Sequence, residues 1–390
     1  MITSPEARHS ASKILTELIR FDSVSSRSNL PIIDWIEKFL ADRDVASVRF
    51  PDENRQKSNL VATIGPAEVP GYILSGHTDV VPVEGQDWTV DPFGGEIIGE
   101  RLYGRGSSDM KGYLACVLSR LDEMLEAPLT RPLHLVFSYD EEVGCVGVRK
   151  AITGIAEWPV RPLGCFVGEP TDMDVVVGHK GKRSVRVEIT GKTGHSSLAP
   201  NFVNAAEYGA RLTTFISDIG RELAASGARD SLYDMPHSTG HVGVLKGGTQ
   251  LNIVPDHCTL DFEFRVIAAD DADALVERVM NFAATELVPA MQAVAPETGI
   301  VFTDLSEIPG LDTDPSEDII VFAKRLAGRN SHSKVAYGTE GGLFTTMAGI
   351  PTVVIGPGKI DRAHKADEFV LLSELDQCCS FLDRLIAECR

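Results

Sequence analysis

The chain has 390 residues, of which 43% are hydrophobic and 24% are charged, a balance that is ordinary for a globular protein. This length exceeds the usual size of one domain, so we expect two. The formal net charge of −19 argues against nucleic acid as a partner, because nucleic acid selects basic surfaces. No apolar stretch reaches the roughly 18 residues expected of a membrane span, so we expect no membrane partner.

The start of the chain and the cysteines bear on its location. Residues 1–8 lack the basic segment followed by an apolar core that is typical of a secretion signal. The seven cysteines form no CxxC pair, and their number is odd. We therefore expect reduced thiols and a cytoplasmic protein.

The first part of the chain alternates helical and extended patterns. Apolar periodicity predicts helices over 6–20, 30–42 and 110–125. Five short runs end in a histidine or an acid, or in a loop that carries one; they cover 72–76, 101–108, 133–138, 165–168 and 352–356. This alternation indicates an α/β fold with a mostly parallel sheet and helices on both faces.

The pattern changes near residue 180, where polar and apolar residues begin to alternate as in a half-buried antiparallel strand. The elements that follow one another have the βαββαβ order of a ferredoxin-like domain. They are a strand at 183–190, a helix at 201–219, strands at 242–254 and 258–266, a helix at 271–286 and a strand at 298–304. We therefore expect an inserted domain over 180–306, and a first domain formed by 1–179 and 307–390.

Histidines and carboxylates follow the ends of the runs in the first domain. Ligands of an open α/β sheet bind outside the carboxyl ends of its strands, so these side chains should converge at one edge. Crowded carboxylates repel one another unless they are protonated or bind a cation, and oxygen with imidazole ligands suits zinc or a similar divalent ion. The residues are His77, Asp79, Asp109, Asp140, Glu141, Glu142, Glu169 and His364.

Each of these residues has a simpler reading when it is taken alone. Asp109 could cap a helix, the acids at 140–142 could lie in a solvated turn, and His364 could be an exposed loop residue. Their common position after strands favours a metal site. His195 lies in the inserted domain, and is either an ordinary surface histidine or a group brought to the site by domain closure or by a partner subunit. The chain has no Gly-x-Ser-x-Gly elbow, which argues against a serine hydrolase.

Five segments resemble the zinc-dependent aminoacylase family, which includes acetylornithine deacetylases, succinyl-diaminopimelate desuccinylases and glutamate-releasing carboxypeptidases. They come in the family's order; they read SGHTDVVPVEGQDWTVDPFGGEIIGERLYGRGSSDMKG, SYDEEVG, VGEPTDMDVVVGHKG, GKTGHSSLAP and GPGKIDRAHKADEF. The resemblance implies a phosphorylase/hydrolase-like zinc-peptidase catalytic domain. It also implies that the inserted ferredoxin-like domain forms a homodimer.

The resemblance further implies a ligand set. Asp109 would bridge two zinc ions, which cobalt can replace. His77 and Glu169 would complete one site, and Glu142 and His364 would complete the other.

The remaining roles also come from the resemblance. Glu141 would be the general base, although the sequence alone does not say which of Glu141 and Glu142 binds metal. The Asp79 carboxylate would orient His77 by accepting from the other ring N–H of that imidazole, and His195 would stabilise the oxyanion in the active site of the opposite subunit. The candidates for substrate binding are Lys180, Asn252, Arg265, Thr339, Glu340 and Gly341.

Three shorter segments bear on the substrate, which is a small N-acyl amino acid in this family. HKG at 179–181, GHSS at 194–197 and YGTEGGLF at 337–344 look most like acetylornithine deacetylases, which implies N-acetyl-L-ornithine and arginine biosynthesis. Lys180 stands where desuccinylases typically carry an arginine-rich segment. Deacylases of acetylcitrulline or succinyl-diaminopimelate, and carboxypeptidases or dipeptidases of the same fold, remain alternatives. A non-catalytic metal-binding protein is disfavoured, because it would not need a spare carboxylate beside Glu142.

Overall fold

The computed structural model describes residues 5–390, with side chains from residue 11 onward. Residues 1–8, which we compared with a secretion signal, therefore lie partly outside the described part of the chain. The described residues form two compact units. The larger unit comprises the chain up to residue 178 together with 311–334 and 339–390, and the smaller unit comprises 179–310 and 335–338.

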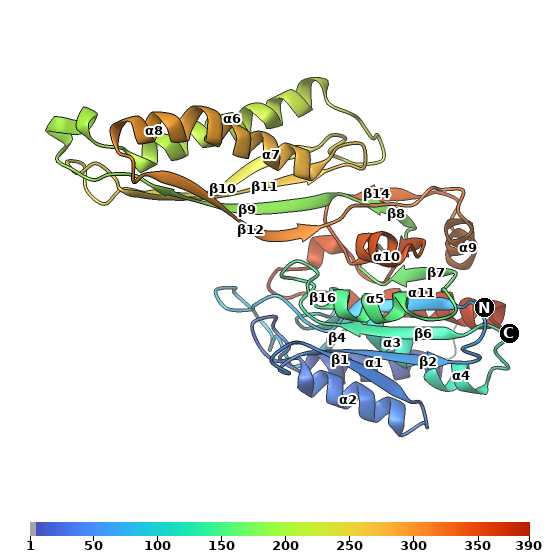
Figure 1. Cartoon of the computed structure of the whole chain (residues 1–390). Coiled ribbons are helices and arrows are strands. Elements are labelled where there is room, and N and C mark those ends of the chain that lie inside the picture. Colours follow the sequence, from blue (N-terminus) through green and yellow to red (C-terminus); the bar gives the residue numbers. More distant parts are fainter. Residues whose placement is uncertain (1–4) are drawn as a thin grey trace. The chain divides into compact units, whose positions relative to one another are not determined.

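A nine-stranded mixed sheet forms the centre of the larger unit (Figure 1). Its strands follow the order β1-β2-β6-β3-β7-β15-β8-β13, with β14 paired to β8. They are β1 (Ser47–Pro51), β2 (Ser58–Ile64), β3 (Tyr72–His77), β6 (Leu133–Ser138), β7 (Gly164–Val167), β8 (Val176–His179), β13 (Leu311–Asp312), β14 (Ser333–Val335) and β15 (Thr352–Val354).

The centre of this sheet is parallel. Strands β6, β3, β7 and β15 run in one direction, so their carboxyl ends meet at one edge. Strands β1 and β2 on one flank, and β8 on the other, run antiparallel to their neighbours. The expectation of a mostly parallel sheet is therefore correct for the strands that precede the predicted site, and wrong for the flanks.

Helices cover both faces of the sheet. The main hydrophobic core lies under α1 (Pro5–Ile19), α2 (Leu30–Ala41), α3 (Lys111–Leu118), α4 (Leu121–Glu126), α9 (Asp318–Ala327) and α11 (Leu372–Glu388). Helices α5 (Val148–Ala156) and α10 (Gly341–Ala348) pack against each other on the other face. The helix that we predicted over 110–125 is two helices, because the backbone breaks at residues 119–120.

The run 101–108 does not join the main sheet, which corrects our expectation for one of the five runs. It contributes β5 (Arg101–Tyr103) to a separate three-stranded sheet with β4 (Ile97–Ile98) and β16 (Phe369–Leu371). Gly104 and Gly106 follow with φ of 148° and 83°, a conformation that favours glycine and ends the strand. Asp109 therefore reaches the site from a loop that leads into α3.

The smaller unit is a four-stranded antiparallel sheet with helices on one side (Figure 1). Its elements are β9 (Gly181–Thr190), α6 (Ala205–Ser226), β10 (Thr239–Gly247), β11 (His257–Val266), α7 (Ala272–Phe282), α8 (Val288–Val294) and β12 (Gly299–Ile308). This βαββαβ order confirms the predicted fold class. Helix α6 begins four residues later than we expected, because the Asn204 side chain caps it by accepting from the N–H of Ala206 at 3.0 Å.

Three further short helical turns lie at Ser196–Asn201, Ala283–Leu287 and Ile360–Arg362. Alternate residues of β11 face the helices and are buried, which is the pattern of a sheet covered on one face. Among residues 5–390, no helix combines the length and the apolar character that crossing a membrane requires.

Candidate metal centre

The carboxyl ends of the central strands bring most of the predicted ligands together. His77 is the last residue of β3, Glu141 and Glu142 follow β6, and Glu169 lies two residues after β7. Side chains at the ends of neighbouring parallel strands meet at one edge of the sheet. His364 comes from the loop after β15.

Asp109 lies between the two histidines. Its Oδ1 is 3.0 Å from His77 Nε2, and its Oδ2 is 3.3 Å from His364 Nε2. The Asp109 side chain is 7% exposed and that of His77 is fully buried, whereas that of His364 is 51% exposed. One carboxylate can therefore offer an oxygen to each of two cations.

The carboxylates of Glu141, Glu142 and Glu169 also lie close to His77. His77, Glu141 and Glu169 offer ligand atoms that all lie within 4.8 Å of one another, and so do His77, Asp109 and Glu142. His364 Nε2 is 3.0 Å from Glu142 Oε2. The structure thus brings all five predicted metal ligands and the predicted base together, although their roles remain predictions.

Burial makes these carboxylates difficult to ionise. It raises the pKa of Glu141 and Glu169 well above the ordinary value, and that of Glu142 to about 7. The charge of Asp109 adds to the effect on Glu142 and Glu169. Among the residues that the structure describes, no hydrogen-bond donor reaches Glu169 Oε1.

The two imidazoles offset only part of this charge. Burial opposes the ionisation of Asp109, but its hydrogen bonds with His364 and His77 lower its pKa below the ordinary value. The hydrogen bonds to Asp109 and Glu142 in turn raise the pKa of His364 to about 10. A divalent cation would supply the missing positive charge, and the mixed imidazole and carboxylate donors suit one.

The orientation of His77 also suits a metal ligand. Its Nδ1 donates to the backbone carbonyl of Asp79 at 2.8 Å, so Nε2 is the ring nitrogen that faces Asp109 and Glu169 and that a cation would bind. The Asp79 carboxylate is farther away, with its Oδ1 at 3.7 Å from His77 Nδ1. Asp79 therefore holds His77 mainly through its main chain, rather than through the carboxylate that we expected.

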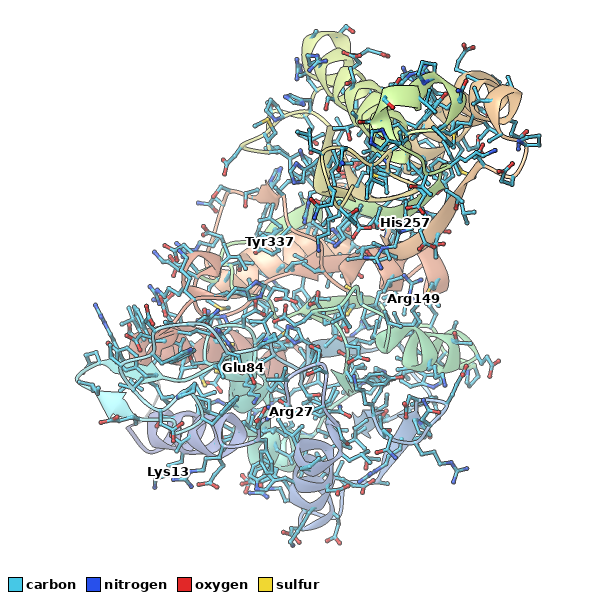
Figure 2. The ribbon with its side chains drawn as sticks, turned by 90° about the vertical axis from the view of Figure 1, so that its left-hand side faces the viewer. Lys13, Arg27, Glu84, Arg149, His257 and Tyr337 are labelled. Atoms are coloured by element: carbon cyan, nitrogen blue, oxygen red, sulfur yellow. The ribbon has the colours of Figure 1, made fainter. Side chains whose placement is uncertain are left out.

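The Asp79 carboxylate instead holds the acidic turn. It accepts from the backbone N–H groups of Glu141 and Glu142 at 3.2 and 3.3 Å, and from Ser25 Oγ at 2.7 Å. The loop that carries Ser25 is tied to the loop after β3 by a 3.3 Å contact between Arg27 and Glu84, which are both labelled in Figure 2.

Sequence reasoning did not single out Ser25, nor Cys145, which touches the predicted base. The Cys145 Sγ donates to Glu141 Oε1 at 3.3 Å, and Cys145 itself is fully buried. Only its position, four residues after Glu141, could have drawn attention to it.

Three predicted substrate contacts lie at the start of α10. Thr339 and Glu340 are almost completely buried, at 0% and 1% exposed. Glu340 accepts from Ser75 Oγ at 3.3 Å, and burial raises its pKa to about 7. Gly341 N–H donates to Thr339 Oγ1 at 3.0 Å. Their assignment as substrate contacts stays a prediction. The hydrogen bonds with Ser75 and Gly341 give Glu340 and Thr339 partners within the larger unit.

The other predicted residues lie in the smaller unit. His195 is exposed, and its Nδ1 accepts from the Ser197 N–H at 3.2 Å. Asn252 is also exposed, in the loop after β10. Lys180 is buried and donates to the carbonyl of His237 at 2.6 Å; burial and the nearby charge of Arg265 both lower its pKa.

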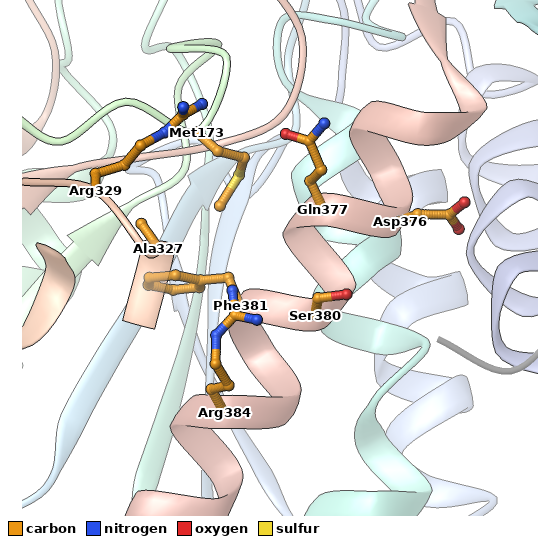
Figure 3. Close-up of a pocket in the computed structure, with 8 residues that line it drawn as sticks. All are labelled: Met173, Ala327, Arg329, Asp376, Gln377, Ser380, Phe381 and Arg384. Carbon is orange, nitrogen blue, oxygen red and sulfur yellow. The ribbon is translucent and has the colours of Figure 1, made fainter. Parts of the chain in front are cut away.

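The larger unit also has a cavity of about 470 Å³ where α9 and α11 pack (Figure 3). Its walls combine apolar side chains with two arginines; they are Met173, Ala327, Arg329, Asp376, Gln377, Ser380, Phe381 and Arg384. None of these residues is a predicted ligand or substrate contact, so this cavity is distinct from the metal cluster.

The family follows from comparison with known proteins. Residues 73–388 match the family described as peptidase family M20/M25/M40. The chain belongs to this family. Members are metal-dependent, and the chain is accordingly a metal-dependent hydrolase of linear amide bonds, which confirms the predicted enzyme class.

Named relatives and solved structures agree with this membership. The chain is 31% identical to an acetylornithine deacetylase of Pasteurella multocida, over 93% of this chain and 92% of the relative. It is 32% identical to one of Myxococcus xanthus, over 96% of each chain.

Two solved structures share the fold at lower sequence identity. An aminopeptidase PepT of Bacillus cereus superposes with a TM-score of 0.74 at 21% identity, covering 98% of each chain. The Bacillus subtilis YXEP protein, described as a dinuclear metal binding peptidase, superposes with a TM-score of 0.65 at 13% identity over 99% of each chain.

The excess of buried carboxylates predicts that a cation stabilises the fold. We expect zinc to raise the melting temperature of chelator-treated protein, because a ligand at about 100 times its Kd stabilises the folded state by about 2.7 kcal/mol. Differential scanning calorimetry over a zinc series would measure this. Asp261→Asn, which removes a surface partner of Arg186 in the smaller unit, should respond to zinc like the wild type. A melting temperature that does not change with zinc would contradict the metal centre.

Proposed function

We propose that the protein is a di-zinc amidohydrolase that removes the acetyl group from N-acetyl-L-ornithine, as a step in arginine biosynthesis. The observation that carries the reaction is the position of the Asp109 carboxylate between His77 and His364, with Glu141 beside them. The substrate is supported by the names of the relatives and by the segments HKG, GHSS and YGTEGGLF.

In this proposal Asp109 contributes to both cation sites. His77 and Glu169 complete one site, and Glu142 and His364 complete the other. Zinc fits the donor set, and cobalt can replace it. When bound, the cations would polarise the amide carbonyl and lower the pKa of water.

Glu141 is the proposed general base. Its carboxylate takes the proton from the attacking water and returns it to the departing amine. The burial that raises its pKa strengthens it as a base. The thiol of Cys145 donates to Glu141 Oε1, which leaves Oε2 for the water.

The smaller unit supplies three of the proposed substrate contacts. Lys180 and Arg265 provide positive charge for the α-carboxylate of the substrate, and Asn252 provides an amide. His195 stabilises the oxyanion of the tetrahedral intermediate. Thr339, Glu340 and Gly341 complete the set in the larger unit.

We also propose different roles for the two parts of the chain. Residues 1–179 and 307–390 form the catalytic domain, and residues 180–306 form a lid through which two chains dimerise, so that His195 acts in the partner's active site. A cytoplasmic location is supported by the cysteines, since all seven are buried and none forms a disulfide.

A substrate panel tests the function. We expect acetate release from N-acetylornithine with a kcat/KM about tenfold or more above that for N-acetylcitrulline, N-succinyl-diaminopimelate and simple dipeptides, which corresponds to about 1.4 kcal/mol of discrimination. Chromatographic quantification of the free amino acid that zinc-loaded protein releases from each substrate would measure this. A preference for another member of the panel would assign that substrate instead, and no turnover of any member would refute the proposed hydrolase.

Replacing the base separates catalysis from metal binding. We expect Glu141→Gln to lower kcat by about 10²–10⁴, because the proton acceptor is lost. Zinc content by mass spectrometry should remain that of the wild type. Glu17→Gln changes an exposed carboxylate on α1 and serves as the control. Near-normal turnover of Glu141→Gln with both zinc ions present would reject this role.

Mixed dimers test the proposed role of His195. We expect His195→Ala and Glu141→Gln homodimers each to be nearly inactive. A mixture that exchanges subunits should recover activity, because one of its two sites then has both groups. Activity and native mass spectrometry of the mixture would be measured together. Verified mixed dimers without recovered activity would show that His195 does not act across the dimer.

A further inference from the structure

Glu368 holds the main chain of Asp109 from inside the larger unit. Its side chain is 1% exposed. Its Oε1 accepts from the backbone N–H groups of Ser108 and Asp109 at 2.9 and 3.1 Å. Its Oε2 accepts from Arg105 Nη1 at 2.7 Å. Because the Asp109 side chain starts from this main chain, Glu368 helps to fix where the shared carboxylate lies.

Arg105 extends the contact toward His364. Its guanidinium is buried, at 1% exposed, and lies over the ring of Trp88. Its Nη2 donates to Gln86 Oε1 at 2.5 Å, and Gln86 Nε2 donates to the backbone carbonyl of His364 at 3.0 Å. A continuous chain of hydrogen bonds therefore joins the main chain of Asp109 to that of His364, and Glu368, Arg105 and Gln86 form it.

The loop at the far end of this chain needs such support. His364 and Asp367 have φ of 60° and 56°, a left-handed conformation that non-glycine residues rarely adopt without help from their surroundings. The Asp367 carboxylate accepts from the N–H and the hydroxyl of Thr89, both at 2.8 Å. The segment 86–89 thus holds this loop at two points.

We propose that Glu368, Arg105 and Gln86 are positioning residues that set the separation of Asp109 and His364, and so determine the affinity of the cation site that Glu142 completes. This inference rests on the proposed two-cation function. The site of His77 and Glu169 should depend on it less, because those residues are held by the ends of β3 and β7. Residues behind the ligands orient them, and their loss typically weakens metal binding by about 10–100-fold.

The test needs a change that removes the link to His364 and leaves the buried ion pair intact. Gln86→Glu does this, because its carboxylate still accepts from Arg105 but no longer donates to the His364 carbonyl. Gln86 is only half-buried, so the variant should fold. Glu368→Gln removes the charge at the other end of the chain.

Calorimetric zinc titration of metal-free protein gives the readout. We expect two zinc equivalents for the wild type. Gln86→Glu should bind one equivalent with wild-type affinity and the second about 10–100-fold more weakly. Glu368→Gln acts on Asp109, which contributes to both sites, so it should weaken the second equivalent by a similar factor and the first equivalent by less. At sub-saturating zinc, kcat should fall while KM stays the same, and added zinc should restore kcat.

A matched control separates positioning from general stability. Asp383→Asn removes the negative charge that faces another buried arginine, Arg120, whose Nε lies 2.6 Å from Asp383 Oδ1. It should lower the melting temperature and leave both zinc affinities unchanged.

Two outcomes would overturn the positioning role. One is wild-type affinity for both zinc ions in Gln86→Glu and Glu368→Gln. The other is an equal loss of the second zinc in Asp383→Asn. A wild type that binds fewer than two zinc ions would instead refute the two-cation function on which the inference rests.

Discussion

Several carboxylates are buried side by side at one edge of the central sheet, with the imidazoles of His77 and His364 beside them. Burial raises the pKa of Glu141, Glu142 and Glu169, and repulsion between the neighbouring acids adds to the effect. A protein tolerates such a cluster when cations or protons compensate it. The architecture of the larger unit can be understood as the means of holding these groups in place against their mutual repulsion.

The same arrangement, a buried carboxylate that accepts from main-chain N–H groups, occurs at two places in the site. Asp79 accepts from the main-chain N–H groups of Glu141 and Glu142, and Glu368 accepts from those of Ser108 and Asp109. In both cases a buried carboxylate holds the backbone of the residues that carry the reactive side chains. The side chains of those residues remain free to bind a cation or a proton, because their positions are fixed through the main chain.

The sequence reveals the parts of the site that depend on strand order, and conceals those that depend on local backbone geometry. His77, Glu142 and Glu169 could be placed at one edge because each follows an apolar run, and such runs become parallel neighbours in an α/β sheet. Asp109 reaches them by a different route, because its run forms a strand of the separate three-stranded sheet and the chain then turns at two glycines with positive φ.

Main-chain partners are the part that sequence patterns do not predict. Any Asp can accept from a backbone N–H, so nothing in the sequence distinguishes the carboxylate contacts of Asp79 from the expected contact with His77. The same holds for Glu368, which stands in the HKADEF segment without a spacing that indicates its partners. The division near residue 180 was visible because the period of the hydrophobic pattern changes there, which reflects a different type of sheet.

The two proposed cation sites are unequal in how the fold supports them. His77 is fully buried at a strand end, and its tautomer is fixed by the Asp79 carbonyl. His364 is half-exposed, lies in a left-handed loop, and is held through Gln86 and Arg105. A ligand on a strand loses less conformational freedom when it binds a cation than a ligand on a loop does. If both cations bind as proposed, the one beside His77 should therefore be held more tightly, and the one beside His364 should exchange first.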